Sequence, residues 1–389
     1  MPVAGRGLTL LCFLSAAAPV LAATAAPVSA DQAGSPALPH AIERAREILA
    51  GALAAGAAPG AAVAVASGGE IVWSEGFGVS DIASGAPVTP ETRFGIGSIS
   101  KTLTLAAALA LADAGKLDPG APVERYLPDF PHRGAGVTVR RIGAHQSGIS
   151  DAFAARHYLS TASFPTVDSA YQPIAAEPMA YQPGTRSEYA TGLFTIVGRV
   201  LERVEGAPYL EVMRRRVLGP AGMSATVPND PTRRPARAAF YVRRAGGGFD
   251  PAPPTDPSFK LPGAGFLSTA EDIARFGAAL LGPGLLSESA RREMFTAVPL
   301  ADGTATPFAL GFQRLEEEGR RVMLQPGGGP GIAAWLAVYP DDGLVIAILS
   351  NATGAPLGDA VRRAVARAFL TPPAPARPPR PAPARPPGS

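Results

Sequence analysis

Cysteine is nearly absent from this chain of 389 residues. The single cysteine, Cys12, lies within an apolar stretch close to the amino terminus. Disulfides and thiolate metal sites are therefore excluded for the rest of the chain. The histidines show no metal-ligand spacing and no His-Glu-x-x-His sequence occurs, so we expect neither a metal nor a cofactor.

Lysine is almost as scarce, although the chain is rich in basic residues. Of 35 basic residues only Lys101, Lys116 and Lys260 are lysines, and the other 32 are arginines. Arginine stays protonated in proteins, so a site that needs an amine able to lose its proton requires a lysine. Only Lys101 has a serine three residues before it, which is Ser98.

A strong excess of charge is also missing. The 32 acidic residues leave a net charge of only +3, and no basic run is interleaved with aromatic residues. We therefore expect no nucleic-acid partner. No Gly-x-Ser-x-Gly sequence occurs, which argues against an α/β-hydrolase, and no phosphate-binding Gly-x-x-x-x-Gly-Lys-Ser/Thr is present.

The two ends of the chain differ from the rest in composition. Residues 1–26 combine Arg6, an apolar stretch over 8–22 and small residues around Ala25, which predicts a secretory signal peptide. The apolar stretch is short for a membrane span, so we expect a periplasmic or extracellular protein without stable membrane insertion after cleavage. Residues 371–389 are almost entirely proline, alanine and arginine, which predicts a disordered tail.

Residues 27–370 are expected to form the folded domain. Strand-like segments occur near both ends, whereas residues of about 99–235 read mainly as helix and loop. This order predicts an α/β (α+β) fold, in which an antiparallel sheet built from both terminal segments is flanked by helices and carries an inserted, mainly helical lobe. The expected strands are 61–66, 71–77, 238–243, 308–314, 322–325, 333–339 and 344–350, and the clearest helices are 42–53, 191–204, 209–217, 269–281 and 357–370.

Ser98 lies where a glycine-punctuated segment turns into a long run of alanine and leucine, which predicts a helix. Residues three positions apart share a helix face, so the Ser98 hydroxyl and the Lys101 amine can meet. If burial lowers the pKa of Lys101, this amine could activate Ser98 as a nucleophile. The alternative is a helix-capping serine followed by an exposed lysine, and the motif alone does not decide between the two.

A series of short motifs begins with the Ser98 segment and continues along the chain. They are residues 94–101, 114–118, 123–131, 137–149, 183–186, 189–192, 238–242 and 263–269. In this order they resemble the serine β-lactamase and penicillin-binding-protein superfamily, within it the class C branch, which also holds esterases and peptidases. Tyr189-x-Thr191 and the segment 238–242 bring the resemblance closest to the mitochondrial β-lactamase-like serine proteases and their bacterial relatives.

The resemblance implies roles for three side chains. Ser98 would be the acylated nucleophile, Lys101 its activator and Tyr189 the partner that relays a proton to the leaving group. Taken alone, Tyr189 would more simply be a core aromatic residue with a satisfied hydroxyl, and the motif context reverses that interpretation.

The resemblance also implies a site for the substrate's carbonyl oxygen. The backbone N–H groups of Ser98 and Gly328 would form an oxyanion hole, with Gly328 on a strand edge after Gly327. Thr191 stands where the family usually has asparagine.

The third family motif departs from the pattern. The family has lysine or histidine, then threonine or serine, then glycine, whereas this chain has Gln325-Pro326-Gly327. Gln325 is neutral, and Pro326 has neither a hydroxyl nor an N–H. In relatives these groups hold a substrate carboxylate and assist proton relay. Their absence argues against classical β-lactamase or DD-carboxypeptidase activity and leaves acyl transfer on a neutral ester or amide feasible.

The sequence therefore predicts a serine hydrolase that acts through a Ser98 acyl-enzyme on a small-molecule or peptide ester or amide. The alternative is a non-catalytic or weakly catalytic binding or scaffold protein of the same fold, motivated by the altered third motif. The sequence leaves the substrate and the oligomeric state open.

Overall fold

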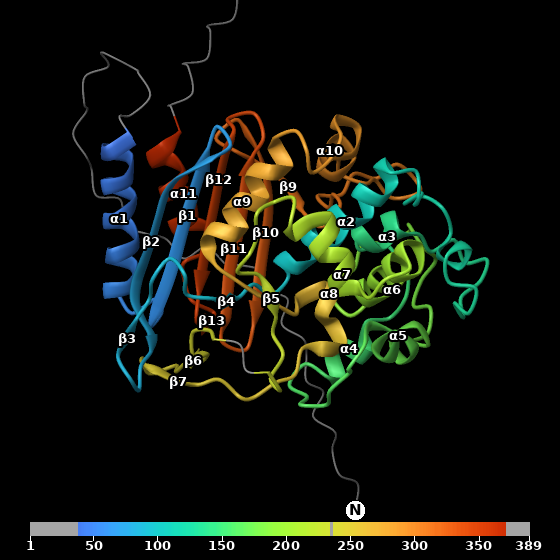
Figure 1. Cartoon of the computed structure of the whole chain (residues 1–389), viewed down its shortest axis with the longest axis horizontal. Helices are drawn as coiled ribbons and strands as arrows, with labels where there is room; N and C mark the ends of the chain where they lie inside the picture. Colours follow the sequence, from blue (N-terminus) through green and yellow to red (C-terminus); the bar gives the residue numbers. More distant parts are fainter. Residues whose placement is uncertain (1–37, 234–235, 371–389) are drawn as a thin grey trace, which may run out of the picture. The chain divides into compact units, whose positions relative to one another are not determined.

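A seven-stranded antiparallel sheet is the framework of the protein (Figure 1). The computed structural model describes residues 38–233 and 236–370, so the predicted signal peptide and carboxyl-terminal tail lie outside the described residues. Strands from the two ends of the chain meet at the centre of the sheet, where Val63 of β1 pairs with Ile348 of β12. The sheet order is β3 (Ala86–Pro87), β2 (Glu70–Asp81), β1 (Gly60–Ser67), β12 (Leu344–Ser350), β11 (Ile332–Tyr339), β10 (Arg320–Gly329) and β9 (Gln313–Glu317).

Both faces of this sheet are covered by helices. In β1, Ala62 and Ala64 belong to the core that includes α9 (Ala270–Leu281), whereas Val63 and Val65 belong to the core under α1 (Leu38–Ala54) and α11 (Asp359–Phe369). Successive side chains of a strand point to opposite faces, so a strand covered on both sides must be apolar throughout. This is why β1 and β12 lack the polar alternation of a half-exposed strand.

The helical lobe is inserted between the two halves of the sheet, which together with the sheet order confirms the predicted fold class. No described helix is both long and apolar enough to span a bilayer. The helical elements of this region are α2 (Ile99–Asp113), η1 (Val123–Arg125), α3 (Val139–Gly143), α4 (Ala152–Arg156), α5 (Val167–Ala175), α6 (Phe194–Glu205), α7 (Tyr209–Met213), the π-helical turn η2 (Arg214–Leu218), η3 (Ser258–Lys260), α8 (Leu261–Ala264) and α10 (Glu288–Phe295). Two small sheets complete the fold, with β4 (Phe94–Gly95), β8 (Phe266–Ser268) and β5 (Val227–Pro228) in one and β13 (Ala352–Thr353), β6 (Tyr241–Arg243) and β7 (Phe249–Pro251) in the other.

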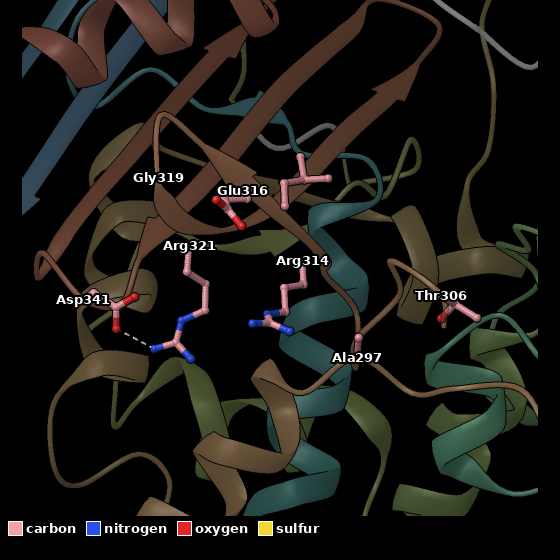
Figure 2. A pocket seen from close by; sticks show the side chains of 8 residues that line it. Ala297, Thr306, Arg314, Glu316, Gly319, Arg321 and Asp341 are labelled. Atoms are coloured by element: carbon pink, nitrogen blue, oxygen red, sulfur yellow. Dashed lines mark hydrogen bonds and ion pairs between the residues drawn. The ribbon is translucent and has the colours of Figure 1, made fainter. Parts of the chain in front are cut away.

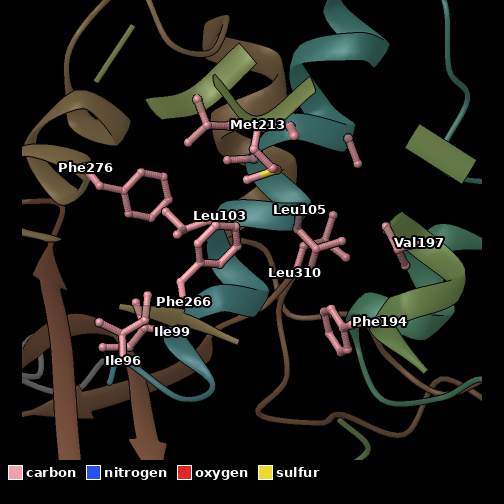
Figure 3. Close-up of a cluster of buried hydrophobic side chains, with 14 of the residues drawn as sticks. Ile96, Ile99, Leu103, Leu105, Phe194, Val197, Met213, Phe266, Phe276 and Leu310 are labelled. Atoms are coloured by element: carbon pink, nitrogen blue, oxygen red, sulfur yellow. The ribbon is translucent and has the colours of Figure 1, made fainter. Parts of the chain in front are cut away.

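Helix α2 passes through the main core (Figure 3). Its side chains Leu103 and Leu105 are fully buried, and they lie among Phe194, Met213 and Phe266 from other elements. A helix that is apolar on all sides is a core helix. The start of this helix, with Ser98 just before it and Lys101 in its first turn, is therefore anchored in the core.

Several predicted element boundaries differ from the structure: β10 and β2 extend about four residues beyond the predicted 322–325 and 71–77, and α1 begins four residues before the predicted 42–53. The helix expected from residue 191 begins at Phe194, because the N–H groups of Thr191 and Gly192 donate to the side chain of Asp151 instead. The strand expected over 308–314 begins only at Gln313, because residues 308–313 close on themselves through a bridge between Phe308 and Gln313. The strand expected over 238–243 is limited to Tyr241–Arg243.

Candidate active site

Ser98 is the residue that precedes the first turn of α2, but its side chain does not cap the helix. Instead, Lys101 Nζ donates a hydrogen bond to Ser98 Oγ over 2.8 Å. Both residues are buried: Ser98 is 8% exposed and Lys101 is 0% exposed. The alternative of a capping serine with a surface lysine is therefore wrong.

Among the described residues, the hydrogen-bond acceptors of the Lys101 amine are all uncharged. Besides Ser98 Oγ these are Thr191 Oγ1 at 3.0 Å and the carbonyl oxygen of Gly263 at 3.1 Å. Burial lowers the pKa of Lys101 to about 7, although the negative charge of nearby Asp151 opposes the shift. The amine is thus close to half-deprotonated at neutral pH.

Tyr189 lies beside this pair. Its ring centroid is 4.9 Å from Lys101 Nζ, and its hydroxyl accepts a long hydrogen bond of 3.4 Å from Gln325 Nε2. Tyr189 as a whole residue is 45% exposed, so it is not a core aromatic residue. Burial of the hydroxyl end raises the pKa of Tyr189, although hydrogen bonding to Ser98 and Gln325 opposes the shift, so the phenol is protonated at neutral pH.

Asp151 holds the segment that carries Tyr189 and Thr191. Its carboxylate accepts hydrogen bonds from the N–H groups of Thr191 at 2.7 Å and Gly192 at 3.0 Å, just before α6 begins. Burial raises the pKa of Asp151, and these N–H groups and Lys101 oppose the shift. Asp151 therefore anchors the loop, and its negative charge raises the pKa of Lys101 against the effect of burial.

His145 supports Tyr189 from the other side. Its ring centroid lies 4.3 Å from that of Tyr189, and its Nδ1 accepts a hydrogen bond from Ala190 N–H at 3.2 Å. Burial, together with the charge of Lys101, lowers the pKa of His145 to about 3. A ring that stays neutral at working pH suits a positioning role for the Tyr189 segment rather than proton transfer.

The predicted oxyanion hole depends on a close approach between two backbones. A Cβ atom on Gly97 would lie 2.6 Å from Gly328 N, and Gly97 has a φ of +49°, so both space and backbone favour glycine here. A Cβ on Gly327 would lie 2.0 Å from the carbonyl oxygen of Ile96. The two glycines thus bring the Ser98 turn against strand β10.

The pairing of β10 explains which of its backbone groups are free. Gly329 pairs with Ile332 around a two-residue turn, so Gly329 hydrogen-bonds to β11 and the alternate residues Gly328 and Pro326 turn their backbone groups away from it. The pairing with β9 has already ended at Leu324. By this register the Gly328 N–H faces neither β11 nor β9, and within the described residues the Ser98 N–H has no backbone acceptor. Both donors are available to a ligand.

The same geometry accounts for proline in this strand. Because the Pro326 position faces neither neighbouring strand, its missing N–H removes no bond of the sheet. Gln325 is 2% exposed, and its amide nitrogen donates to the Pro326 carbonyl at 2.8 Å as well as toward Tyr189. Gln325 is therefore an uncharged hydrogen-bond donor to the tyrosine, and this strand supplies no cation beside it.

A separate surface hollow lies at the other end of β9 and β10 (Figure 2). Arg314, Arg321 and Asp341 line it, and Arg321 pairs with Asp341 at 2.7 Å. None of the residues predicted for the active site lines this hollow. It is distinct from the Ser98 site.

Comparison with known proteins agrees with this geometry. A sequence profile of the Beta-lactamase family matches residues 45–370. The chain belongs to the Beta-lactamase family. The serine beta-lactamase-like protein LACTB of Homo sapiens, a mitochondrial protein, is 26% identical over 427 aligned residues, which cover 80% of this chain and 77% of the relative. The predicted family resemblance is confirmed.

Solved structures show the same fold. The octameric penicillin-binding protein homologue from Pyrococcus abyssi has a TM-score of 0.72 at 22% identity and covers 84% of this chain and 76% of its own. A D-stereospecific amidohydrolase from Streptomyces sp. has a TM-score of 0.66 at 25% identity, with coverage of 84% and 98%. Membership of the Beta-lactamase family supports hydrolase activity in general, whereas the reaction depends on the site.

Sequence reasoning missed three contributors to this Beta-lactamase-family site. Asp151, His145 and the Gly263 carbonyl reach the Ser98 region only through tertiary contacts. His145 and Gly263 lie within the motifs 137–149 and 263–269 that carry the family resemblance, whereas Asp151 lies in none of these motifs.

Proposed function

We propose that this protein is a serine hydrolase that cleaves an ester or amide through a Ser98 acyl-enzyme. The observation that carries the proposal is the contact of 2.8 Å between Ser98 Oγ and a fully buried Lys101 amine. Because no carboxylate in the part of the chain that the structure describes forms an ion pair with this amine, burial can lower its pKa into the working range of a general base.

The contacts of Lys101 suit a neutral amine. A neutral amine has two N–H donors and one lone pair. It can donate to the Gly263 carbonyl and to Thr191 Oγ1 while its lone pair accepts the proton of Ser98. Lys101 would then take this proton as Ser98 Oγ attacks the substrate carbonyl. The two free N–H groups, of Ser98 and Gly328, would stabilise the negative oxygen that forms.

Tyr189 would complete the first half of the reaction as an acid. Its raised pKa keeps the phenol protonated, so the hydroxyl can donate a proton to the leaving oxygen or nitrogen as the acyl-enzyme forms. The phenolate that remains is balanced by the proton on Lys101, which lies against the same ring. Water would then attack the ester to Ser98 by the reverse proton path and release the acid.

Active-site labelling tests this proposal. A fluorescent fluorophosphonate should label the purified protein, and Ser98→Ala should abolish the labelling. Ser289→Ala, an exposed serine on α10, is the matched control and should label like the parent protein. Equal labelling of Ser98→Ala would contradict the acyl-enzyme, and absence of labelling in the parent protein would favour the scaffold alternative.

Export is a separate proposal that rests on residues 1–26 alone. We propose that the chain is secreted or periplasmic, and we expect the mature protein to begin near residue 26. Amino-terminal sequencing of protein purified from a fractionated host would test this expectation.

A further inference from the structure

A cavity of about 470 Å³ lies beside helices α5, α7 and α8 (Figure 1). Its walls come from the loop before α5, the start of α7, the loop after β5 and the segment from η3 into α8. None of the residues assigned to the Ser98 site lines this cavity. Its volume lies in the range of pockets that bind small organic molecules.

The walls of the cavity are tied to one another by the protein itself. The Phe164 N–H donates to Ser258 Oγ at 2.8 Å, and the Asp256 N–H donates to the Ser160 carbonyl oxygen at 2.9 Å. Several lining residues are prolines, whose rings restrict the backbone: Pro165, Pro208, Pro228 and Pro231. A cavity whose walls are already in place has little ordering cost when a ligand binds.

Apolar side chains supply one part of the lining. The ring of Phe164 is half-buried, and Leu261 is the first residue of α8. Leu210 also lines the cavity and is 40% exposed, which is unusual for a large apolar side chain. These side chains suit the apolar body of a ligand.

Carboxylates supply the other part, and two of the three have cationic partners within the protein. Glu202 accepts a hydrogen bond from Arg199 at 3.1 Å, and Asp230 pairs with Arg233 at 3.4 Å. In residues 38–233 and 236–370, no cation pairs with the third carboxylate, Asp256.

Asp256 is only 5% exposed, although it lines the cavity. Its Oδ1 accepts a hydrogen bond from the Ser258 N–H at 2.8 Å, and no described residue donates to its Oδ2. A carboxylate can accept hydrogen bonds at both oxygens. A desolvated carboxylate without a counterion is unfavourable for the protein alone and favourable for binding a cation.

We propose that this cavity binds a small organic cation, namely a protonated amine carried on an apolar body. The ammonium group donates to Asp256 Oδ2, and the apolar body packs against Phe164, Leu210 and Leu261. This ligand site is separate from Ser98 and does not depend on the proposed hydrolase function. Helix α8 contacts both sites, because Leu261 lines the cavity and the Gly263 carbonyl accepts a hydrogen bond from Lys101.

Two probes that differ in one charge test the inference by calorimetric titration of the whole protein. They are 4-phenylbutylamine, which is protonated at neutral pH, and 4-phenylbutan-1-ol, which has the same body and no charge. We expect the amine to bind about tenfold more tightly than the alcohol, the effect of one charge-assisted contact.

Asp256→Asn removes the charge and keeps an oxygen that can accept the Ser258 N–H. It should raise the Kd of the amine about tenfold and leave the Kd of the alcohol unchanged. Asp250→Asn is the matched control, since this exposed carboxylate on β7 pairs with Arg244 and does not line the cavity. A Kd of the amine in Asp256→Asn within about twofold of the parent value overturns the inference, as does a parent protein that binds no amine at millimolar concentration.

A second variant tests the place of the apolar body. Leu210→Ser removes one apolar wall, so it should weaken the amine and the alcohol by a similar factor of about fivefold. Unchanged binding of both probes would show that they bind outside this cavity and would overturn the inference. Thermal melting of each variant separates a folding defect from a loss of binding.

Discussion

Lys101 in the helical lobe and Arg362 against the sheet are both basic and both 0% exposed, but their surroundings are opposite. Arg362 Nη1 donates to Glu317 Oε2 at 3.0 Å and to the Tyr339 hydroxyl at 2.9 Å. Burial alone would lower the pKa of Arg362, yet the hydrogen bonds and charge of Glu317 outweigh it and raise the pKa. Arg362 is therefore a permanent cation that joins α11 to strands β9 and β11.

Lys101 has no such partner. Its acceptors are a serine, a threonine and a backbone carbonyl, and Asp151, whose negative charge raises the pKa of Lys101, forms no ion pair with it among the described residues. The fall of its pKa from 10.5 to about 7 corresponds to roughly 5 kcal/mol in favour of the neutral amine. The comparison shows that burial alone does not define the role of a basic residue. The charge of the groups it touches decides whether it is a structural cation or a base.

The largest expected effect comes from replacing the Lys101 amine with a guanidinium. Lys101→Arg should lower the kcat/KM of a p-nitrophenyl ester by about a thousandfold or more, because arginine cannot accept the Ser98 proton. Lys116→Arg, which keeps an exposed pair with Glu205, should retain parent activity. Activity of Lys101→Arg within tenfold of the parent would contradict the assignment of Lys101 as the base.

Removing Arg362, the structural cation, should lower the stability of the protein rather than its activity. Arg362→Met leaves the mostly buried Glu317 carboxylate without its partner, so the free energy of unfolding should fall by roughly 3–5 kcal/mol. Activity per folded molecule should remain. Arg367→Met, on the same helix and paired with Glu318 at the surface, should cost less than about 1 kcal/mol in urea titration. Equal costs for the two variants would contradict a structural role for the buried pair.

The pH profile sharpens the comparison because Lys101 titrates near neutrality. Only the neutral amine accepts a proton, so kcat/KM should rise with pH, level off above about 7 and fall roughly tenfold per unit below it. The rate of fluorophosphonate labelling should follow the same curve. A midpoint near the ordinary lysine pKa would show that the amine is not desolvated in solution.

The smallest expected effect concerns the neutral donor to Tyr189. Gln325→Ala removes a hydrogen bond that is already long, so kcat/KM should fall by about fivefold, equivalent to roughly 1 kcal/mol. Gln172→Ala, an exposed glutamine on α5, should have no effect. A loss in Gln325→Ala as large as that expected of Lys101→Arg would place Gln325 among the essential groups.

Much of the fold follows from local patterns. The apolar runs around Val63 and Ile346 predicted strands that the structure has within one or two residues, and the Ala/Leu run after Ser98 predicted α2. Prediction was weaker where a distant side chain sets an element's boundary. Asp151 occupies the N–H groups of Thr191 and Gly192, so α6 starts three residues later than the apolar pattern suggests.

The altered third motif also shows the difference between what the sequence predicts and what tertiary contacts decide. From the sequence, Gln325-Pro326 left two interpretations open, a change of specificity or a loss of activity. The strand register shows that Pro326 removes no sheet hydrogen bond and that Gln325 still donates to Tyr189.

The sequence by itself determined that Ser98 and Lys101 share a helix face, because three residues of α-helix bring two side chains together whatever surrounds them. Only the tertiary structure decided whether the Lys101 amine is a permanent cation or a base. The three acceptors of Lys101 lie 3, 90 and 162 positions away in the chain. A pKa depends on the solvent that all these segments exclude together and on the charges they bring, and no local sequence pattern encodes that sum.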